Sequence, residues 1–320
     1  MRDSRRGATV LAWACVATAA GILASPAAHL VHRRYNSLQV MAQSLVHWAG
    51  LLAGPPALVA ARTRNRRLGL AAGGVGVAGL ATAAWIAGRP EVATSAPVVT
   101  VAHFNLLYLN DRLALDLAAI AATGADVLTF SEVTPRHLAT LQHSALASHY
   151  PYRVERPGPY ATGTALWSRV PVRTVDGPVV EHHTVAADVD LGPSGPVRVI
   201  VIHTRSPLHH YGEWADDLAE LAGTAVPDEP AVMIGDFNAG WGHPELRALT
   251  GAGWRDAHRA RGRGLTSSWP TDRWWSPPFV RIDHAVVNAG LEVTAVIDVD
   301  LPGSDHRGLV VSVARRRRAR

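Results

Sequence analysis

The sequence predicts an α/β protein: a two-sheet α/β sandwich of four layers, preceded by about three transmembrane helices. Three observations lead to this fold class. Long uncharged runs fill roughly the first ninety residues, apolar segments of strand length outnumber helical segments after them, and polar residues recur where those strands end. Two sheets packed face to face with helices outside would bury such strands. The 320 residues are enough for one large domain or two ordinary ones.

The N-terminal region contains three runs without a charged side chain, at residues 7–31, 35–61 and 68–88. Each exceeds the roughly 20 residues that a helix needs to cross a bilayer. We therefore expect transmembrane helices at about 8–31, 37–61 and 68–88. The middle run contains Pro55-Pro56, so it could be kinked or only partly inserted. In the third, Gly69 and Gly73 have the spacing that lets helices approach closely.

Arginine counts predict the orientation of these helices. The N-terminal tail has three Arg and the 62–67 loop has four, whereas the loop between the first two runs has only Arg33 and Arg34. Cytoplasmic loops carry the excess of positive charge, so the N-terminus and the second loop are expected in the cytoplasm. The chain is then a multi-pass cell-membrane protein whose domain after Arg89 is extracytoplasmic. Alternatively, the first run is a cleaved signal peptide with small residues near 24–28, although two further apolar runs favour an uncleaved anchor.

The distribution of charge limits the partners of the soluble part. Residues 1–96 carry ten Arg against Asp3 and Glu91, the tail after Ala314 carries five Arg, and the whole chain has a net charge of +5, so residues 97–314 have a net charge of −8. Tight, sequence-independent duplex binding needs extensive phosphate neutralisation and is therefore disfavoured. The basic ends suit a membrane surface. Cys15 is the single cysteine, which excludes an intrachain disulfide.

The rest of the chain divides into a linker at 91–97, a catalytic domain at 98–314 and a basic tail at 315–320. Apolar runs predict buried strands, and apolar residues at helical spacing predict helices. Residues 255–278, rich in Arg and Trp, are expected to be a loop. Strands are expected at 98–102, 126–130, 164–168, 185–189, 197–202, 231–235, 282–287, 292–299 and 309–313, and helices after Asn110, from Pro135, at 213–221 and at 244–249.

Polar residues gather at the ends of these strands. In Met233–Asn238 a short apolar strand stops at Gly235, and alternation along extended chain places Asp236 and Asn238 on one side. Each such residue alone has a structural explanation: His203 could be a buried histidine bonded to a carbonyl, and Asp283 could pair with Arg281. Eight of them at strand ends favour a common site: Asn105, Glu132, His203, Asp236, Asn238, Asp283, Asp305 and His306.

These residue types suit phosphoester hydrolysis. Oxygen ligands such as Glu132, Asp236 and Asp305 favour Mg²⁺ or Mn²⁺. A divalent ion neutralises a phosphodiester and stabilises the charge that develops on the leaving oxygen. A histidine oriented by a carboxylate, here His306 with Asp283, is suited to proton transfer or to binding phosphate.

The region from about Val98 to Val313 resembles the endonuclease/exonuclease/phosphatase superfamily, with the deoxyribonuclease I-like and exonuclease III-like fold, and its membrane-anchored arrangement resembles a bacterial subgroup. The blocks follow the order of the family across the soluble domain. They are His103-Phe104-Asn105, Ser131-Glu132-Val133, Gly163 to Arg169, Ile202-His203-Thr204, Gly235-Asp236-Phe237-Asn238, Arg281-Ile282-Asp283-His284 and Ser304-Asp305-His306.

The resemblance implies a role for each residue of the set. Glu132 would be the main metal ligand, with Asn105 and Asp305 close to the same ion. Asp236 would position or deprotonate the attacking water, Asn238 would steady that water and a phosphate oxygen, and His203 would contact the phosphate. Asp283 and His306 would form the carboxylate–histidine pair. Two departures stand out: Ser131 replaces the usual Gln before the metal-binding Glu, and Arg205 is a candidate for an additional phosphate contact.

The resulting hypothesis is a membrane-anchored, divalent-metal-dependent hydrolase of phosphodiester bonds, preferentially a nuclease. The alternative within the same fold is a phospholipid or other small-phosphodiester hydrolase. An alternative of another class is a catalytically inactive, membrane-anchored binding module. The expected partners are the membrane and a phosphodiester substrate, either nucleic acid or a lipid headgroup, and no protein partner can be inferred. Trp269, Trp274 and Trp275 near the Arg-rich 255–263 segment could hold a single strand or a membrane interface.

Overall fold

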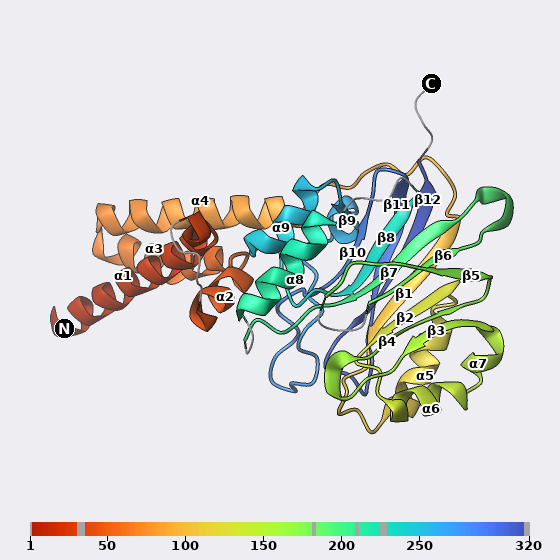
Figure 1. Cartoon of the computed structure of the whole chain (residues 1–320). Coiled ribbons are helices and arrows are strands. Elements are labelled where there is room, and N and C mark those ends of the chain that lie inside the picture. Colours follow the sequence, from red (N-terminus) through yellow and green to blue (C-terminus); the bar gives the residue numbers. More distant parts are fainter. Residues whose placement is uncertain (1, 31–35, 181–183, 209–210, 225–228, 317–320) are drawn as a thin grey trace. The chain divides into compact units, whose positions relative to one another are not determined.

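The computed structural model describes residues 2–30, 36–180, 184–208, 211–224 and 229–316, which form two compact units (Figure 1). The N-terminal unit comprises Met1–Gly88 together with Gly240–Pro244. The second unit comprises Arg89–Ala239 and Glu245–Arg320 and carries both sheets. We refer to it as the sandwich unit.

The N-terminal unit is helical. Two of its segments, Arg6–Ala27 and Arg66–Ala87, are long and apolar enough to cross a membrane. The middle predicted segment is bent by 88° between Ser37–Ser44 and Ala49–Thr63, and up to three spans are present if this bent pair counts as one. The break lies between Ser44 and Ala49, whereas Pro55-Pro56 lies at the start of the helix Gly54–Thr63. The elements are α1 (Arg2–Ala24), η1 (Ser25–Leu30), α2 (Ser37–Ser44), η2 (Ala49–Ala53), α3 (Gly54–Thr63) and α4 (Arg66–Ala87).

Close helix contact in this unit occurs at a different glycine pair from the one that sequence spacing indicated. A Cβ added to Gly79 of α4 would collide with the backbone of Gly50 in η2. By contrast, a Cβ on Gly73 would meet no atom within 4 Å, and one on Gly69 would only touch the Ala60 side chain at 3.7 Å. Small residues therefore allow the backbones of η2 and α4 to approach each other, as in other helix interfaces formed by small residues.

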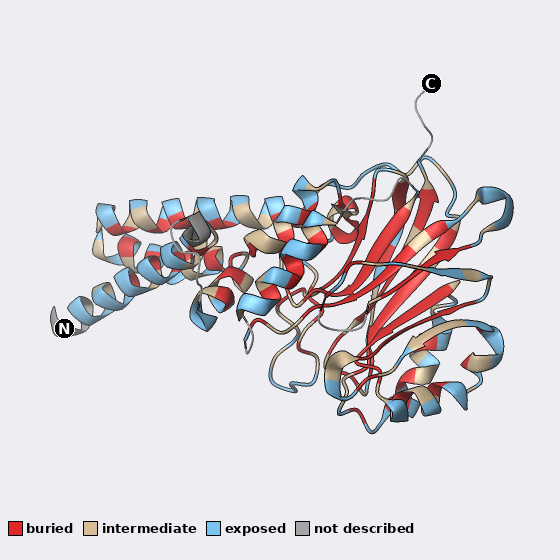
Figure 2. Ribbon diagram, viewed as in Figure 1, coloured by how far each residue is buried: buried red, intermediate tan, exposed pale blue. Residues whose placement is uncertain are grey.

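The sandwich unit is built on two six-stranded mixed sheets, which confirms the predicted fold class. The first sheet has the order β11-β12-β1-β2-β4-β3 and the second β5-β6-β7-β8-β10-β9. Valine-rich faces of the two sheets, including Val101, Val127, Val199 and Val232, form one buried core between them (Figure 2). The strands are β1 (Val99–Asn105), β2 (Val127–Ser131), β3 (Tyr152–Arg156), β4 (Thr164–Ser168), β5 (Val172–Val175), β6 (Val185–Val189), β7 (Val197–His203), β8 (Ala231–Asp236), β9 (Arg255–Asp256), β10 (Asp283–Val287), β11 (Leu291–Val299) and β12 (Gly308–Arg315).

Helices cover the outer faces of the sheets. Leu113 and Ile120 of α5 and Leu141 of α6 share a second core with Phe104 and Trp167 of the first sheet. Near the second sheet, the indole of Trp214 in α8 donates to the carbonyl of Phe237 at 3.3 Å, which joins this helix to the end of β8. The helices of the sandwich are α5 (Leu113–Ala122), α6 (Pro135–Gln142), α7 (Leu146–His149), α8 (Tyr211–Gly223), α9 (Pro244–Gly251) and α10 (Ala257–Ala260), with short 3-10 turns η3 (Tyr160–Thr162) and η4 (Gly192–Ser194).

Sequence patterns missed several short elements. Strand β3 and strand β5 were not predicted because they are only partly buried and lack a continuous apolar run. The segment expected to be a loop at 255–278 begins instead with strand β9 and helix α10, whose N-cap Asp256 accepts from the backbone N–H of Arg259. A single turn of helix is too short to produce a helical period.

The predicted linker lies along the sandwich unit without regular secondary structure. The carboxylate of Glu292 in β11 accepts hydrogen bonds from the backbone of Thr94 at 3.2 Å and Ser95 at 2.7 Å. The Arg255 guanidinium is 2.8 Å from the Glu91 carboxylate, and the Arg261 guanidinium donates to the Glu91 carbonyl at 2.6 Å. These contacts engage Arg255 and Arg261, two cations of the 255–263 segment for which the sequence suggested ligand binding.

Strand register brings distant polar residues to one edge of the sandwich. In the first sheet β1 and β2 are parallel, with Asn105 opposite Ser131. In the second sheet β7 and β8 are parallel, with His203 opposite Asp236, and β10 is antiparallel to β8, with Asp283 opposite Asp236. Parallel pairing aligns the strand ends within each sheet, and packing of the two sheets then brings Asn105 beside Asp236, 131 positions away.

Candidate active site

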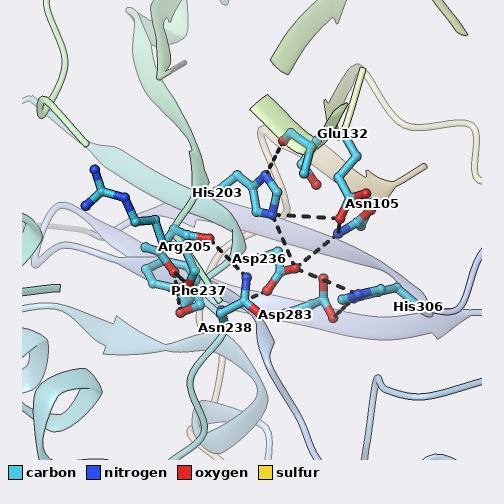
Figure 3. Close-up of polar contacts among 12 residues, drawn as sticks. Asn105, Glu132, His203, Arg205, Asp236, Phe237, Asn238, Asp283 and His306 are labelled. Carbon is cyan, nitrogen blue, oxygen red and sulfur yellow. Dashed lines mark hydrogen bonds and ion pairs between the residues drawn. The ribbon is translucent and has the colours of Figure 1, made fainter. Parts of the chain in front are cut away.

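Asp236 lies at the centre of a buried polar cluster formed by both sheets (Figure 3). Its Oδ1 accepts from the backbone N–H of Asn238 at 2.8 Å, and its Oδ2 accepts from Nδ2 of Asn105 at 3.0 Å. The preceding Gly235 has φ 156°, and a Cβ there would collide with the carbonyl of Ile202 on β7. Glycine therefore lets β8 run close beside β7 and deliver Asp236 to the edge.

Glu132 joins the cluster from the end of β2. Asn105 Nδ2 donates to its Oε1 at 3.0 Å, and the backbone N–H of Tyr108 donates to its Oε2 at 2.7 Å. Glu132 has φ 58°, in the left-handed region that costs a non-glycine residue of order 1–3 kcal/mol. Such strain persists only where surrounding contacts hold it, and here it turns the carboxylate toward Asp236.

A histidine–carboxylate pair closes one wall of the cluster. His306 Nδ1 is 2.9 Å from Asp283 Oδ2, and its Nε2 faces Asp236 Oδ2 at 3.8 Å and Asp305 Oδ1 at 3.9 Å. Although burial alone would lower it, attraction from Asp283 and Asp236 raises the pKa of His306 to about 10. Burial likewise opposes ionisation of Asp283, yet the adjacent His306 and a hydrogen bond from Ser268 lower its pKa. The pair is thus an imidazolium and a carboxylate at neutral pH.

His203 forms the opposite wall and has the opposite charge behaviour. Its Nδ1 donates to the carbonyl of Ala161 at 2.9 Å, so the neutral ring presents Nε2 as an acceptor. That Nε2 faces Asp236 Oδ2 at 3.7 Å and Glu132 Oε1 at 3.9 Å. Burial, together with repulsion from His306, lowers the pKa of His203 to about 3.

Three side chains that could bind a metal ion thus converge from both sheets. His203 Nε2 and carboxylate oxygens of Glu132 and Asp236 lie within 4.8 Å of one another, and a second such group joins Asp236, Asp283 and His306. Burial and repulsion from Asp283 raise the pKa of Asp236, because two buried anions here have too few compensating charges. A buried, acceptor-rich group of this kind fits a divalent cation.

Asp305 adds a further carboxylate beside His306. Its Oδ2 accepts from the indole of Trp269 at 2.9 Å, while its buried Oδ1 has no hydrogen-bond donor within the described part of the chain. Burial raises the pKa of Asp305. The charge of His306 opposes this rise, and repulsion from Glu132 adds to it. A buried carboxylate oxygen that accepts no hydrogen bond from the described residues also fits a cation site. The amide of Asn105 presents Nδ2 to the cluster and uses Oδ1 to accept from Leu107, so ligation through its oxygen requires that amide to rotate.

The structure positions Asn238 beside Asp236 but turns Arg205 away. Asn238, with φ 47°, donates from Nδ2 to the carbonyl of Thr204 at 3.0 Å. The guanidinium of Arg205 instead approaches α8, where it is 3.2 Å from the Glu213 carbonyl and 3.5 Å from the Asp217 carboxylate (Figure 3). The phosphate contact of Arg205 stays a prediction, and in this arrangement Asp217 is a partner for its charge.

Sequence reasoning missed several residues that hold the cluster in place. His103 is buried behind it, with Nδ1 3.0 Å from Thr129 Oγ1 and Nε2 3.3 Å from Ser131 Oγ. Ser268 Oγ accepts from the backbone N–H of Asp283 at 3.2 Å. His103 lies two positions before Asn105 in β1, so the strand period could have placed both on one face. The roles of Ser268 and Trp269 had no such signal, because they belong to irregular chain.

Two mixed sheets with acidic residues and histidines converging at strand ends define a phosphoesterase. Residues 102–306 match the model of the Endonuclease/Exonuclease/phosphatase family, and this match spans more than half of the chain. The chain belongs to this family. The match begins inside β1 and ends at His306, so it includes every residue of the polar cluster.

Solved structures share the fold at low sequence identity. TDP2 of D. rerio, complexed with a single strand DNA product, is 18% identical with a TM-score of 0.53, covering 68% of this chain and 98% of that one. The 3'-5' exonuclease (NExo) from Neisseria meningitidis is 18% identical with a TM-score of 0.52, covering 66% and 98%. An AP endonuclease from Archaeoglobus fulgidus is 15% identical with a TM-score of 0.53, covering 67% and 98%. No curated protein matches the sequence.

Proposed function

We propose that this protein is a membrane-anchored, divalent-metal-dependent phosphodiesterase that hydrolyses its substrate by direct attack of water. The observation that carries the proposal is the convergence of Glu132, His203 and Asp236 beside the cationic His306. Glu132, His203 and Asp236 come within 4.8 Å of one another, and His306 Nε2 is 3.8 Å from Asp236. Such a site offers one region for a cation and one for an anionic phosphate.

The metal site that we propose uses Glu132 with Asn105 and Asp305, and the preferred ion is Mg²⁺ or Mn²⁺. Its support is the oxygen-rich donor set and the free buried Oδ1 of Asp305. A bound ion would neutralise charge on the phosphate and on the leaving oxygen. Because the acceptor group of the structure contains His203 and Asp236 instead of Asp305, the metal affinities of Asp305→Asn and His203→Gln distinguish the two ligand sets.

The remaining residues bind, orient and move protons. Burial raises the pKa of Asp236, so its carboxylate is suited to accept a proton from water. The backbone N–H of Asn238 holds Oδ1 of this carboxylate in place. His306 carries a proton on Nε2 and directs it into the same space, where it can bind a phosphate oxygen or protonate the leaving group. Asp283 keeps this proton in place through Nδ1. His203 would contact the phosphate from the opposite wall.

We propose nucleic acid, preferentially single-stranded, as the substrate. The D. rerio structure holds a single strand DNA product, and the acidic net charge of residues 97–314 disfavours duplex binding. Next to the site, the indole of Trp269 donates a hydrogen bond to Asp305. Trp274 and Trp275 are 96% and 62% exposed, and the guanidinium of Arg273 lies 5.5 Å from the centre of the Trp275 ring. Exposed aromatic faces of this kind stack on bases.

The substrate proposal is tested with the purified full-length chain. Single-stranded DNA, duplex DNA, RNA, phosphoinositides and bis(p-nitrophenyl) phosphate are each incubated with Mg²⁺ or Mn²⁺, with Glu132→Gln as the inactive control. We expect metal-dependent cleavage of single strands above duplex. Cleavage of phosphoinositides alone would replace the nucleic-acid assignment by the lipid-hydrolase alternative, and no cleavage of any diester would contradict the phosphodiesterase assignment.

The membrane assignment is also a proposal, supported by the two apolar helices of spanning length and the bent third segment. Arg counts then place the N-terminus in the cytoplasm and the catalytic domain outside. A reporter fused after Arg320 should be active only in its extracytoplasmic form. Activity confined to the cytoplasmic form would contradict three crossings, and cleavage near Ala28 would support the signal-peptide alternative.

A further inference from the structure

The N-terminal unit contains a basic cavity that the phosphoesterase reaction does not use. Its volume is about 740 Å³, and it is lined by Arg6 and Trp13 of α1 and by Arg62 and Arg64 around the α3–α4 turn. Figure 1 shows the N-terminus and this turn at the same end of the unit. The cavity therefore joins two segments that are more than fifty residues apart in sequence.

Local structure holds the arginines of the turn in position. Arg64 has φ 56° and ends α3 in the left-handed conformation, and Asn65 begins α4 by accepting from the backbone N–H of Leu68 at 3.1 Å. Thr63 Oγ1 donates to the Val59 carbonyl at 2.8 Å. These caps make the turn short, so Arg62 and Arg64 lie on a defined frame next to the first turns of α1.

The positive charge of the cavity has no neutralising partner. Within the described residues, none of the guanidiniums of Arg6, Arg62 and Arg64 forms an ion pair with a carboxylate. Asp3 is the single acidic residue among residues 1–88, so the sequence of this unit offers almost no internal counter-charge. Three like charges around one cavity repel each other, and an anion bound between them would relieve that repulsion.

The cavity also lies where the apolar segments begin. The apolar span of α1 starts at Arg6, and that of α4 starts at Arg66, two residues after Arg64. In a membrane, the starts of two such spans lie at the level of the lipid headgroups. The partly exposed Trp13 is a residue type favoured at that depth. In a membrane, lipid headgroups would therefore lie next to the cavity.

We propose that this cavity binds the phosphate group of an anionic phospholipid in the leaflet at this end of the helices. Guanidinium groups bind phosphate oxygens through paired hydrogen bonds, and basic pockets between transmembrane helices are suited to anionic headgroups. The site is distinct from the catalytic cluster and does not depend on catalysis. Both arginine-rich segments were assigned to the cytoplasmic side from their charge, so the lipid would belong to the cytoplasmic leaflet.

The test compares two variants with the same change in charge. The full-length chain is extracted in mild detergent with a mixture of phosphatidylglycerol and phosphatidylcholine, and retained lipid is counted by native mass spectrometry. We expect the wild type to retain phosphatidylglycerol preferentially. Arg62→Gln/Arg64→Gln should weaken this binding roughly 30-fold. Each arginine contributes about 1 kcal/mol to binding, and about 1.4 kcal/mol corresponds to a tenfold change in affinity. The control Arg66→Gln/Arg67→Gln changes two exposed arginines that do not line the cavity and should leave binding near wild type.

Three results would overturn the proposal. Equal losses in both double variants would show diffuse surface charge without a site, and equal retention of the two lipids by the wild type would show no preference for anions. Displacement of the lipid by inorganic phosphate at similar concentration would show a site for soluble phosphate. If Arg62→Gln/Arg64→Gln does not fold by circular dichroism, Arg6→Gln replaces it: this residue is exposed on the opposite wall, and unchanged phosphatidylglycerol retention would contradict the proposal.

Discussion

The two histidines that face Asp236 have similar burial and opposite charge states. His306 Nε2 is 3.8 Å and His203 Nε2 is 3.7 Å from the same carboxylate oxygen, and both side chains are almost completely buried. They differ in what holds the other ring nitrogen. Asp283 binds that nitrogen of His306 and helps to raise its pKa to about 10, whereas the carbonyl of Ala161 binds that nitrogen of His203, and burial with repulsion from His306 lowers the pKa of His203 to about 3.

This difference divides the site into a cationic wall and an acceptor wall. On the His306 side a proton and a positive charge point at Asp236. On the His203 side a lone pair points at Asp236 and Glu132, and these three side chains form a group that could hold a metal ion. The partner of the distant nitrogen therefore determines which histidine is positively charged and which presents a lone pair.

The largest effect is expected at the residue that both walls share. Asp236→Asn keeps the shape of the side chain but removes the negative charge and most of its ability to accept a proton. We expect turnover of bis(p-nitrophenyl) phosphate to fall by roughly 10² to 10⁴-fold. Asp190→Asn, a charge change at an exposed turn, is the control. Near-wild-type turnover by Asp236→Asn would show that neither wall acts through this carboxylate.

The next largest effect should fall on the acceptor wall. Glu132→Gln removes the charge of the main metal ligand that we propose, so metal affinity should fall strongly and activity should return only at high Mn²⁺. Asp305→Asn is expected to lower affinity by about 10 to 100-fold, and His203→Gln by less. Isothermal titration with Mn²⁺ measures all three. A greater loss in His203→Gln than in Asp305→Asn would move the ion to the Glu132, His203 and Asp236 group.

The cationic wall predicts a pH dependence. Activity that needs protonated His306 should decline as pH rises toward about 10. Asp283→Asn removes the anion that raises this pKa, so the alkaline limit should move to lower pH, while His203→Gln should leave it in place. The pH profiles of kcat for the wild type and both variants measure the shift. An unchanged limit in Asp283→Asn would contradict the assignment.

The same pair should affect stability in a defined pH window. The folded pKa of His306 lies above its ordinary value of 6.5, so the pair stabilises the fold fully below about pH 6.5 and loses this contribution as pH rises through about 10. The wild type should therefore lose thermal stability relative to Asp283→Asn over that alkaline range. Parallel melting curves of the two proteins between pH 6 and 10.5 would contradict this linkage.

The smallest effect is expected at Arg205, outside both walls. Its guanidinium is directed to α8 and Asp217, so Arg205→Gln should change KM by no more than about twofold. Because Arg205 lies away from the reacting groups, Arg205→Gln is the matched reference for the larger effects predicted at Asp236, Glu132 and Asp283. A large rise in KM with unchanged folding would show that this arginine turns toward the phosphate when substrate binds.

Much of the sandwich could be predicted from sequence because its central strands are buried on both faces. Runs such as 199–202 and 231–234 are continuously apolar, and their strands end at His203 and Asp236. The edge strands β3 and β5 have mixed exposure and gave no such signal. Their positions depend on pairing with β4 and β6, which is a tertiary contact.

The site was predictable in membership and less so in geometry. Residue types at strand ends identified Asp236, Glu132 and His306, because a strand end fixes where its last side chain lies. The sequence could not show that Arg205 has Asp217 as a partner twelve positions later, or that Glu132 adopts φ 58°. The contact of Arg205 depends on how α8 packs, and the backbone angle of Glu132 depends on how the loop after β2 packs. Neither packing arrangement is encoded in a local sequence pattern.

The most direct test of the account is the metal dependence of the wild-type site. The full-length chain is stripped with EDTA, and turnover of bis(p-nitrophenyl) phosphate is followed as Mg²⁺ or Mn²⁺ is added back at neutral pH. Because the reaction that we propose needs a divalent cation beside Glu132, His203 and Asp236, we predict no turnover without metal and saturable recovery with either ion. Full turnover by the metal-free protein would contradict the proposed centre.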